Sequence, residues 1–261
     1  PYEMKKMMGN EIIPRLKEKF SLPTIVHRTV LTQGIGESFL SEIIADLENS
    51  LTEKNIKLAY LPSPGMVRLR LTTSGDDENA LLNSVNSKIE ELKKLIPQHI
   101  YGYEKDTLEQ IVGTLLREKK QTLSLAESCS GGLISHLITS VPDSSEYFMG
   151  SVVSYSYESK TNLLGVTKEM LEQFGAVSEE VVVQMALGAN KTFNTDWAIS
   201  ASGIAGPSGG MEGKPVGTVW IAVAGPGGVK AKKFQFGGDR ERNISVTAIT
   251  ALNMLRKALL A

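Results

Sequence analysis

A short segment rich in serine and glycine lies in the second half of the chain, where residues 126–132 read AESCSGG. An apolar, strand-like run precedes it and a helical pattern follows it. Small residues at such a strand-to-helix turn expose backbone N–H groups at the helix N-terminus, which suits an anion or a developing oxyanion. Ser128 would lie at the carboxyl edge of the sheet, where ligands bind in open α/β folds. Ser128 is therefore the candidate nucleophile, and the alternative is a serine that only caps the helix.

A serine nucleophile needs a base, and the histidines of the chain are poorly placed to supply one. His27 and His99 precede this part of the chain, and His136 falls inside the helix after Ser128. A Ser-His-Asp triad is therefore not expected. Lysine can act as the base when burial lowers its pKa, because desolvation disfavours the ammonium form. Lys160, just after the next predicted strand, is the candidate base, and the alternative is a solvated helix residue.

Two further residues bear on this pair. Tyr155 precedes Lys160 closely in the sequence and could hold a hydrogen bond to either Ser128 or Lys160. Cys129 adjoins Ser128 and is the alternative nucleophile. Adjacent residues at a turn point in different directions, so only one of the two can face a ligand. We favour Ser128, because a lone cysteine is more often a small buried apolar residue.

A second glycine-rich segment, residues 200–210 with the sequence SASGIAGPSGG, also follows a predicted strand. Its amides could cradle a phosphate or close the site as a lid, and the alternative is a structural loop. Further along, Arg240 opens the last helix and could pair with a substrate phosphate. The alternative for Arg240 is a surface salt bridge with Asp239 or Glu241.

Alternating helices and strands must position these residues. The pattern predicts helices at 108–119, 131–140, 178–192 and 240–260, a helical turn at 159–164, and strands at 121–125, 150–157, 197–202, 218–224 and 230–236. Helices that alternate with buried strands indicate an α/β fold, here a three-layer α/β/α sandwich whose last strand pair is antiparallel.

A smaller α+β module is predicted upstream of this sandwich. Strand-like runs at 24–31, 56–61 and 66–72 and helices at 37–47 and 76–95 give the order β-α-β-β-α, with a hairpin turn at 62–65. Residues 97–104 contain proline and glycine and form the natural boundary. Residues 3–20 are predicted to be largely helical, with Pro14 kinking or splitting the helix.

Composition excludes several classes of function. The formal net charge is −1, so no overall field draws the chain to nucleic acid or an anionic membrane. One cysteine cannot form an internal disulfide, and with three scattered histidines it offers no zinc spacing, so we expect no metal site and a reducing cytoplasm. No apolar run approaches the roughly 20 residues that span a bilayer, so no membrane association is expected.

The chain resembles the C-terminal domain of the competence/damage-inducible protein CinA, a family that contains the bacterial nicotinamide-nucleotide amidases. The resemblance covers residues 101–261 and is carried by AESCSGG at 126–132, VSY at 153–155 with Lys160, GAVS at 175–178, SGIAGP at 202–207, KPVGTV at 214–219 and GDR at 238–240. Residues 24–100 resemble the middle, KH-like domain of this family. Residues 1–23 resemble the tail of the preceding molybdopterin-binding-like domain, so no pyrophosphatase activity is expected from this chain.

The resemblance implies hydrolysis of nicotinamide mononucleotide to nicotinate mononucleotide and ammonia. It implies Ser128 as nucleophile, Lys160 as general base and Tyr155 as an aid to proton transfer. It assigns the oxyanion to the amides of Ser130, Gly131 and Gly132, and the nucleotide to Gly203, Ala205, Gly206, Thr218 and Arg240, with the phosphate on Arg240. No cofactor is required, because lysine supplies the base and backbone amides the electrophile.

The partners implied are the small-molecule nucleotide and a second copy of the chain in a homodimer. RNA binding is not expected, because Gly34-Ile35-Gly36-Glu37 lacks the second glycine of a G-x-x-G loop. Two other functions stay open at this point: a protein-binding module linked to competence or DNA damage, and an amidase with a different substrate. The occurrence of Ser128, Tyr155 and Lys160 together favours the enzyme.

Overall fold

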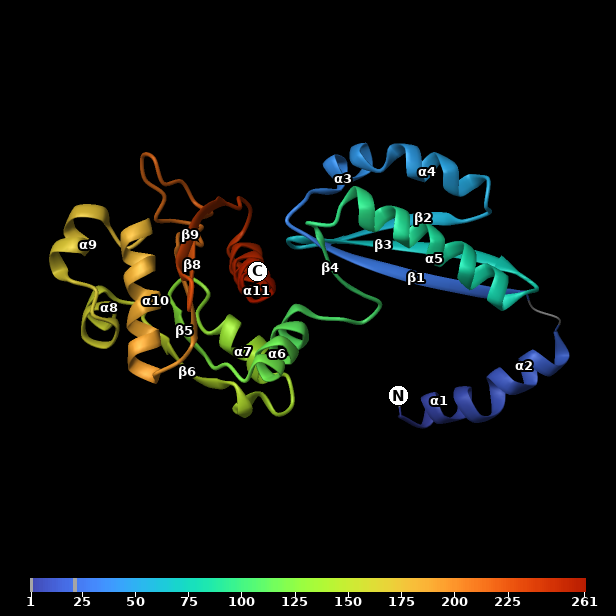
Figure 1. The fold of residues 1–261 in the computed structure, drawn as a ribbon, viewed down its shortest axis with the longest axis horizontal. Helices are drawn as coiled ribbons and strands as arrows, with labels where there is room; N and C mark the ends of the chain where they lie inside the picture. The colour runs from blue at the N-terminus through green and yellow to red at the C-terminus, as the bar shows by residue number, and fades with distance from the viewer. Residues whose placement is uncertain (1, 21–22) are drawn as a thin grey trace. The chain divides into compact units, whose positions relative to one another are not determined.

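The computed structural model describes residues 2–20 and 23–261. These residues form two compact units (Figure 1). The first unit comprises the described parts of Pro1–Val30 together with Glu37–Leu61 and Arg68–Ile100. The second comprises Leu31–Gly36, Pro62–Val67 and Tyr101–Ala261. The predicted chemistry falls entirely within the second unit.

The chain begins with a helical segment made of α1 (Tyr2–Met7), the π-helical turn η1 (Met8–Ile12) and α2 (Ile13–Lys19). Pro14 lies in the first turn of α2, directly after the π-helical turn, and without an N–H it cannot donate to that preceding turn. The predicted splitting of the helix at Pro14 therefore takes the form of a π-helical turn just before it. No residue of these three elements is buried.

The first sheet has the strand order β2-β3-β1-β4. Its strands are β1 (Thr24–Gln33), β2 (Lys57–Ser63), β3 (Met66–Gly75) and β4 (Ile100–Tyr103), and the helices are α3 (Glu37–Ile43), α4 (Ala45–Thr52) and α5 (Glu78–Leu95). Strands β2 and β3 are neighbours, as the predicted hairpin requires. Strand β4 lies in the segment predicted as an irregular boundary, since Ile100 to Tyr103 reads as too short an apolar run to be recognised.

The single helix predicted after β1 is two helices, because the backbone of Ile44 leaves the helical region at φ −102° and ψ 11°. The break changes which side chains face inward. Leu40, Ile44 and Leu47 are buried, whereas Phe39 and Ile43 are 70% and 45% exposed. In α5, Val85, Ile89 and Leu92 are buried, whereas Leu95 at the end of the helix is exposed.

The second unit contains a five-stranded sheet in the order β6-β5-β7-β8-β9. The strands are β5 (Leu123–Glu127), β6 (Phe148–Val153), β7 (Trp197–Gly203), β8 (Thr218–Gly225) and β9 (Gly228–Gln235). Strand β5 pairs in parallel with β6 and β7, while β7–β8 and β8–β9 are antiparallel. The antiparallel pairing predicted for the last two strands is confirmed, and it extends one strand further into the sheet.

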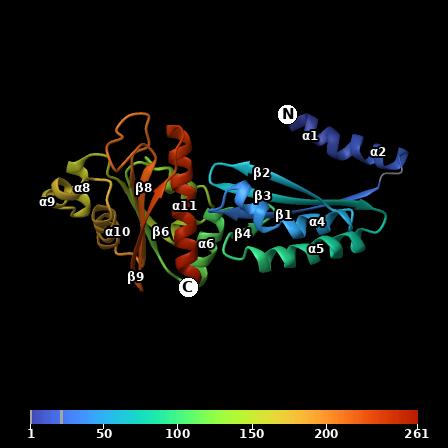
Figure 2. The ribbon, with the colours of Figure 1, turned by 90° about the horizontal axis from the view of Figure 1, so that it is seen from above.

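Helices cover both faces of this sheet, so the predicted three-layer sandwich is confirmed (Figures 1 and 2). One core lies under α6 (Leu108–Lys119), α7 (Leu133–Thr139) and α11 (Arg240–Leu260) and includes Val112, Ile134 and Leu252. The other lies under α8 (Tyr157–Leu164), α9 (Lys168–Phe174) and α10 (Glu179–Phe193) and includes Leu164, Leu171 and Met185. A 3₁₀ turn, η2 (Ser144–Glu146), precedes β6.

Two local features of the second unit bear on the prediction from sequence. Helix α9 was not predicted, although Thr167 caps it by accepting a hydrogen bond from the Met170 amide. Ser178 caps α10, accepting a hydrogen bond from the Val181 amide.

Within the described residues, no helix combines the length and apolar character needed to cross a bilayer.

Candidate active site

Ser128 follows directly after β5, at the carboxyl end of the parallel part of the sheet. Its amide donates to the Ala201 carbonyl oxygen at 2.9 Å, and its carbonyl accepts from the Gly131 amide at 3.2 Å. Gly131 and Gly132 have φ angles of 61° and 98°, which turn the chain from the strand into α7. The N-cap of α7 is Gly132, so Ser128 is not the serine cap that was the alternative.

Lys160 lies on α8, whose first turn is fixed by a capping box. The Ser156 hydroxyl accepts from the Ser159 amide at 3.0 Å, and the Ser159 hydroxyl accepts from the Ser156 amide at 3.1 Å. At the other end of α8, Gly188 of α10 approaches closely, since a Cβ added there would lie 2.1 Å from the Leu164 carbonyl oxygen. The absence of a side chain at Gly188 therefore lets α8 pack tightly against α10.

The Lys160 side chain extends from α8 to the end of β5, where Ser128 lies. Its Nζ lies 3.0 Å from Ser128 Oγ and donates to the Ser154 carbonyl oxygen at 2.6 Å. Lys160 is only 1% exposed, and among the described residues it has no carboxylate partner. The alternative of a solvated helix residue is thus wrong. Burial lowers the pKa of Lys160 to about 8, because the unpaired ammonium form is desolvated.

Cys129 points away from this pair into the core. Its thiol belongs to the cluster that contains Leu125 and Ile134, and the residue is 6% exposed. Burial raises the pKa of the Cys129 thiol to about 12. A thiol in this state is a poor nucleophile at neutral pH, so the geometry favours Ser128 over its neighbour.

The amides expected to receive an oxyanion are largely engaged elsewhere. The Gly132 amide donates to Glu127 Oε2 at 3.0 Å, and the Gly131 amide donates to the Ser128 carbonyl. The prediction that these two amides serve the oxyanion is therefore wrong. The Ser130 amide has no acceptor among the described residues, and the Ser130 side chain is buried with its hydroxyl unpartnered. Ser130 thus remains the candidate oxyanion donor of the three.

Arg240 links the loop that contains Gly206 to the segment that contains Tyr155. Its Nη1 donates to the Gly206 carbonyl oxygen at 2.8 Å, and its Nη2 donates to the Tyr155 hydroxyl at 2.8 Å. Among the described residues Arg240 forms no salt bridge with Asp239 or Glu241, so that alternative is wrong. The Tyr155 hydroxyl bonds to Arg240 and not to Ser128 or Lys160, which is a correction to the hydrogen bond predicted for it.

The second glycine-rich segment is held by α11 through its carbonyl groups. Asn243 Nδ2 donates to the Ala205 carbonyl at 2.9 Å, next to the Arg240 bond to Gly206. Because the C=O and N–H of a trans peptide point in opposite directions, the Gly206 amide is directed away from α11. Neither the Ala205 nor the Gly206 amide has an acceptor within the described part of the chain. Both amides therefore keep an unused donor, on residues that are themselves buried.

Gly203 and Thr218 support this segment through contacts between β7, β8 and β9. A Cβ at Gly203 would lie 2.8 Å from the Thr218 carbonyl oxygen, so only glycine allows this close pairing of β7 and β8. The Thr218 side chain is fully buried, and its hydroxyl lies 2.7 Å from the Pro215 carbonyl and 2.8 Å from Gln235 Oε1. The direct contact with substrate predicted for these two residues stays a prediction.

Glu127 and Asn243 are the residues that sequence reasoning missed. Glu127 is fully buried at the end of β5, and Asn243 is 1% exposed on α11. A glutamate at the end of an otherwise apolar strand was a visible signal, because a buried carboxylate needs several donors. Asn243 carried no comparable signal, since asparagine on a helix is usually exposed.

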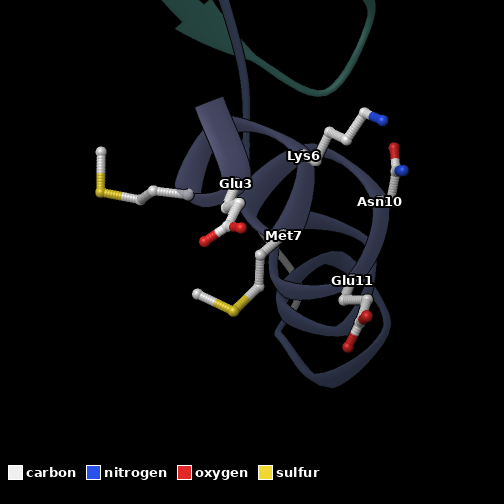
Figure 3. Close-up of a pocket in the computed structure, with 6 residues that line it drawn as sticks. Glu3, Lys6, Met7, Asn10 and Glu11 are labelled. Carbon is white, nitrogen blue, oxygen red and sulfur yellow. The ribbon is translucent and has the colours of Figure 1, made fainter. Parts of the chain in front are cut away.

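Two hollows on the described surface lie elsewhere. One runs along the N-terminal helical segment and is lined by Glu3, Met4, Lys6, Met7, Asn10 and Glu11, whose side chains spread outward from the helix (Figure 3). Another is lined by residues of α4 and α5, including Lys88 and Glu91. The first is lined by exposed side chains that cannot exclude water. In the second, Lys88 Nζ lies 3.0 Å from Ser50 Oγ, but Lys88 is also paired with the Glu91 carboxylate at 3.1 Å, unlike Lys160. No group of three or more histidine, cysteine, aspartate or glutamate side chains in the described residues is placed to hold a metal ion.

Comparison with known families agrees with this architecture. Residues 105–259 match the family described as CinA C-terminal domain, and residues 27–102 match the damage-inducible protein CinA KH domain. This chain belongs to the CinA family. Its two matched regions correspond to the sandwich that carries Ser128 and Lys160 and to the smaller α+β module before it.

Relatives and solved structures carry the same family description. A CinA-like protein of Flavobacterium psychrophilum is 49% identical over the whole chain, and a putative competence-damage inducible protein of Caldicellulosiruptor bescii is 41% identical. The chain spans 62% of the length of each. The crystal structure of competence/damage inducible protein CihA from Agrobacterium tumefaciens is 36% identical with a TM-score of 0.57, covering 59% of this chain and 96% of that one.

Proposed function

We propose that this chain is an amidase that hydrolyses nicotinamide mononucleotide to nicotinate mononucleotide and ammonia. The observation that carries the reaction class is the 3.0 Å contact between Lys160 Nζ and Ser128 Oγ, together with the burial that lowers the pKa of Lys160 to about 8. A lysine in this state is neutral in an appreciable fraction of molecules near neutral pH and can accept a proton. The choice of nicotinamide mononucleotide comes from the resemblance to the amidases of the family.

In the proposed first half-reaction, neutral Lys160 removes the proton from Ser128 as Oγ attacks the carboxamide carbon. The oxyanion of the tetrahedral intermediate accepts a hydrogen bond from the Ser130 amide. The C–N bond then breaks, Lys160 returns its proton to the leaving nitrogen, and ammonia departs. The product on the protein is a nicotinoyl ester of Ser128.

Water completes the reaction. Lys160, again neutral, takes a proton from a water molecule that attacks the ester carbonyl, and Ser128 leaves with that proton. The nucleotide phosphate binds at the Arg240 guanidinium and the free Gly206 amide, both of which donate to phosphate oxygens. Arg240 already holds the Gly206 carbonyl, so a phosphate there would extend an existing arrangement of donors.

The test is ammonia release from nicotinamide mononucleotide by the wild type, Ser128→Ala and Lys160→Ala. Loss of release in both variants supports the serine amidase. A folded wild type that releases no ammonia contradicts the proposed substrate and favours another amide or a protein-binding module. Activity that survives in Ser128→Ala would return the role of nucleophile to Cys129.

We also propose that the chain acts in the cytoplasm as a homodimer with no nucleic-acid partner. Light scattering at several protein concentrations tests the dimer, and a gel-shift titration with single-stranded RNA tests the last point.

A further inference from the structure

Glu127 is a buried carboxylate that takes part in none of the steps above. It is fully buried, and its two oxygens accept four hydrogen bonds from the start of α7. The Gly132 and Ile134 amides donate to Oε2 at 3.0 Å and 3.1 Å. The Ser135 amide donates to Oε1 at 2.8 Å, and the Ser135 hydroxyl donates to the same oxygen.

These bonds replace an ordinary helix cap. Gly132, at the N-cap of α7, has no side chain to receive the first amides of the helix. The carboxylate five residues earlier receives them instead, and its negative charge lies at the positive end of the helix. The side-chain oxygens of Glu127 accept from donors at the start of α7, so they are engaged there and not with a reacting group.

The residues between this carboxylate and the helix are those that carry the nucleophile. Ser128 is the next residue, and the turn from 128 to 131 is closed between its two ends by the Gly131 amide. The Glu127 side chain therefore ties α7 back to β5 around Ser128. The end of β5 is itself held in the sheet, because the Ser128 amide donates to the Ala201 carbonyl of β7.

The base is attached to the same residue through the main chain. The Glu127 carbonyl accepts from the Ser154 amide at 2.8 Å, and the Ser154 carbonyl accepts from Lys160 Nζ at 2.6 Å. A displacement of Glu127 would therefore disturb both Ser128 and the Ser154 carbonyl that accepts from Lys160.

We propose that Glu127 is a positioning residue whose bonds to the start of α7 hold Ser128 Oγ in line with Lys160. This rests on the proposed Ser128–Lys160 amidase chemistry but not on the choice of substrate. Glu127 contacts neither reacting group through its side chain, so its effect is on the geometry of attack. Misplacement of reacting groups by about 1 Å can cost about 100-fold in rate.

The experiment measures the reactivity of Ser128 without any nucleotide. Phenylmethanesulfonyl fluoride transfers its sulfonyl group to a reactive serine oxygen with loss of fluoride, and intact-mass spectrometry follows the adduct over time. Wild type should be labelled at Ser128, and Lys160→Ala should be labelled much more slowly. Wild type that is not labelled would remove the reactivity on which the proposal depends and would overturn it.

Glu127→Gln has nearly the same shape but sets an NH₂ group against amide donors. We expect labelling about 100-fold slower, with a far-ultraviolet circular dichroism spectrum like that of the wild type. With nicotinamide mononucleotide, kcat should fall by a similar factor while KM changes by less than about threefold, because the phosphate contacts are untouched. A folded Glu127→Gln protein labelled at the wild-type rate would overturn the proposal.

Ser135→Ala keeps the test decisive if Glu127→Gln does not fold. It removes one donor and leaves every backbone amide in place, and we expect labelling slower by about threefold to tenfold. The matched control is Ser140→Ala at the other end of α7, where the hydroxyl donates to the Leu137 carbonyl at 2.7 Å. Labelling should be unchanged there. No effect of Ser135→Ala, or an equal effect of Ser140→Ala, would overturn the proposal.

Labelling of Ser128 and ammonia release are separate measurements, and one can be negative while the other is positive. A wild type labelled at Ser128 that releases no ammonia contradicts the proposed substrate, while the role of Glu127 is still decided by the labelling rates.

Discussion

The two glycine-rich segments of the sandwich look alike in sequence but use their backbones in opposite ways. In residues 126–132, the amides of Gly131 and Gly132 are consumed by the Ser128 carbonyl and the Glu127 carboxylate. In residues 200–210, side chains of α11 hold the carbonyls of Ala205 and Gly206 and leave the amides free. Glycine density therefore does not identify an anion site. Whether an amide can bind an anion depends on whether it already donates to an acceptor within the protein.

The difference separates two functions within the candidate site. The first segment is rigid around the bond-making groups, so changes there should act on kcat. The second presents donors to a ligand, so changes there should act on KM.

The largest effect is expected for Lys160→Met, which keeps the bulk of the side chain but has no base. We expect kcat for ammonia release to fall by at least about 10³-fold with little change in KM, because only proton transfer is lost. Steady-state kinetics measure both. A large rise in KM without a fall in kcat would contradict the division between the segments.

The next effect is on the pH dependence of the wild type. The pKa of Lys160 is lowered to about 8, and its neutral form is the active one, so kcat/KM should rise about tenfold per pH unit below that value and level off above it. Rates measured from pH 6 to 9.5 in buffers of constant ionic strength check this. A profile that is flat across this range would exclude Lys160 as the base.

Arg240→Ala tests the second segment. We expect KM for nicotinamide mononucleotide to rise by about tenfold with kcat reduced less than about threefold, since a charge-assisted contact to phosphate is lost. Nicotinamide riboside, which has no phosphate, is the matched substrate and should show no such change. An equal loss with both substrates would assign Arg240 a structural role.

Tyr155→Phe should have a smaller effect of the same kind. It removes only the hydroxyl that accepts from Arg240 Nη2, so KM should rise by about twofold to fourfold. In Arg240→Ala the same substitution should add almost nothing, because the two residues then no longer interact. An additive double variant would instead support an independent role for Tyr155 in proton transfer.

The smallest effect is on stability. Between about pH 8 and 10.5 the folded protein holds Lys160 neutral while the unfolded chain is still protonated, so stability rises with pH across this window. The shift corresponds to about 3 kcal/mol of cost at lower pH. Lys160→Met should recover part of it and raise the free energy of unfolding at pH 7 by about 1–2 kcal/mol, offset by the unpaired Ser154 carbonyl. Urea unfolding at pH 7 and 9.5 checks the sign.

Much of the fold could be predicted from periodicity, because buried strands and amphipathic helices leave strong patterns. The sandwich and its last helix at 240–260 follow the prediction closely. The break at Ile44 and the short strand β4 could not be seen, since neither involves proline or a long apolar run. Tertiary packing decides such local features.

The candidate site was predictable in its residues but not in its hydrogen bonds. Ser128 and Lys160 could be named as a pair, but their spacing of 32 residues says nothing about distance. The acceptor of the Gly132 amide is the Glu127 side chain, whose orientation depends on the strand register, and the acceptor of the Gly131 amide is the Ser128 carbonyl, which the shape of the turn decides. Sequence reports which groups are available, and the fold reports which are already used.

The missing side chain at Gly188 has a consequence for engineering. It sets how closely α8 approaches α10, and Lys160, the proposed base, lies on α8 and moves with it. A methyl group there would press on the Leu164 carbonyl and push the helix outward, far in sequence from any residue that meets a substrate. Laboratory evolution of this chain toward other amides should therefore change many positions around the nucleotide while position 188 stays invariant.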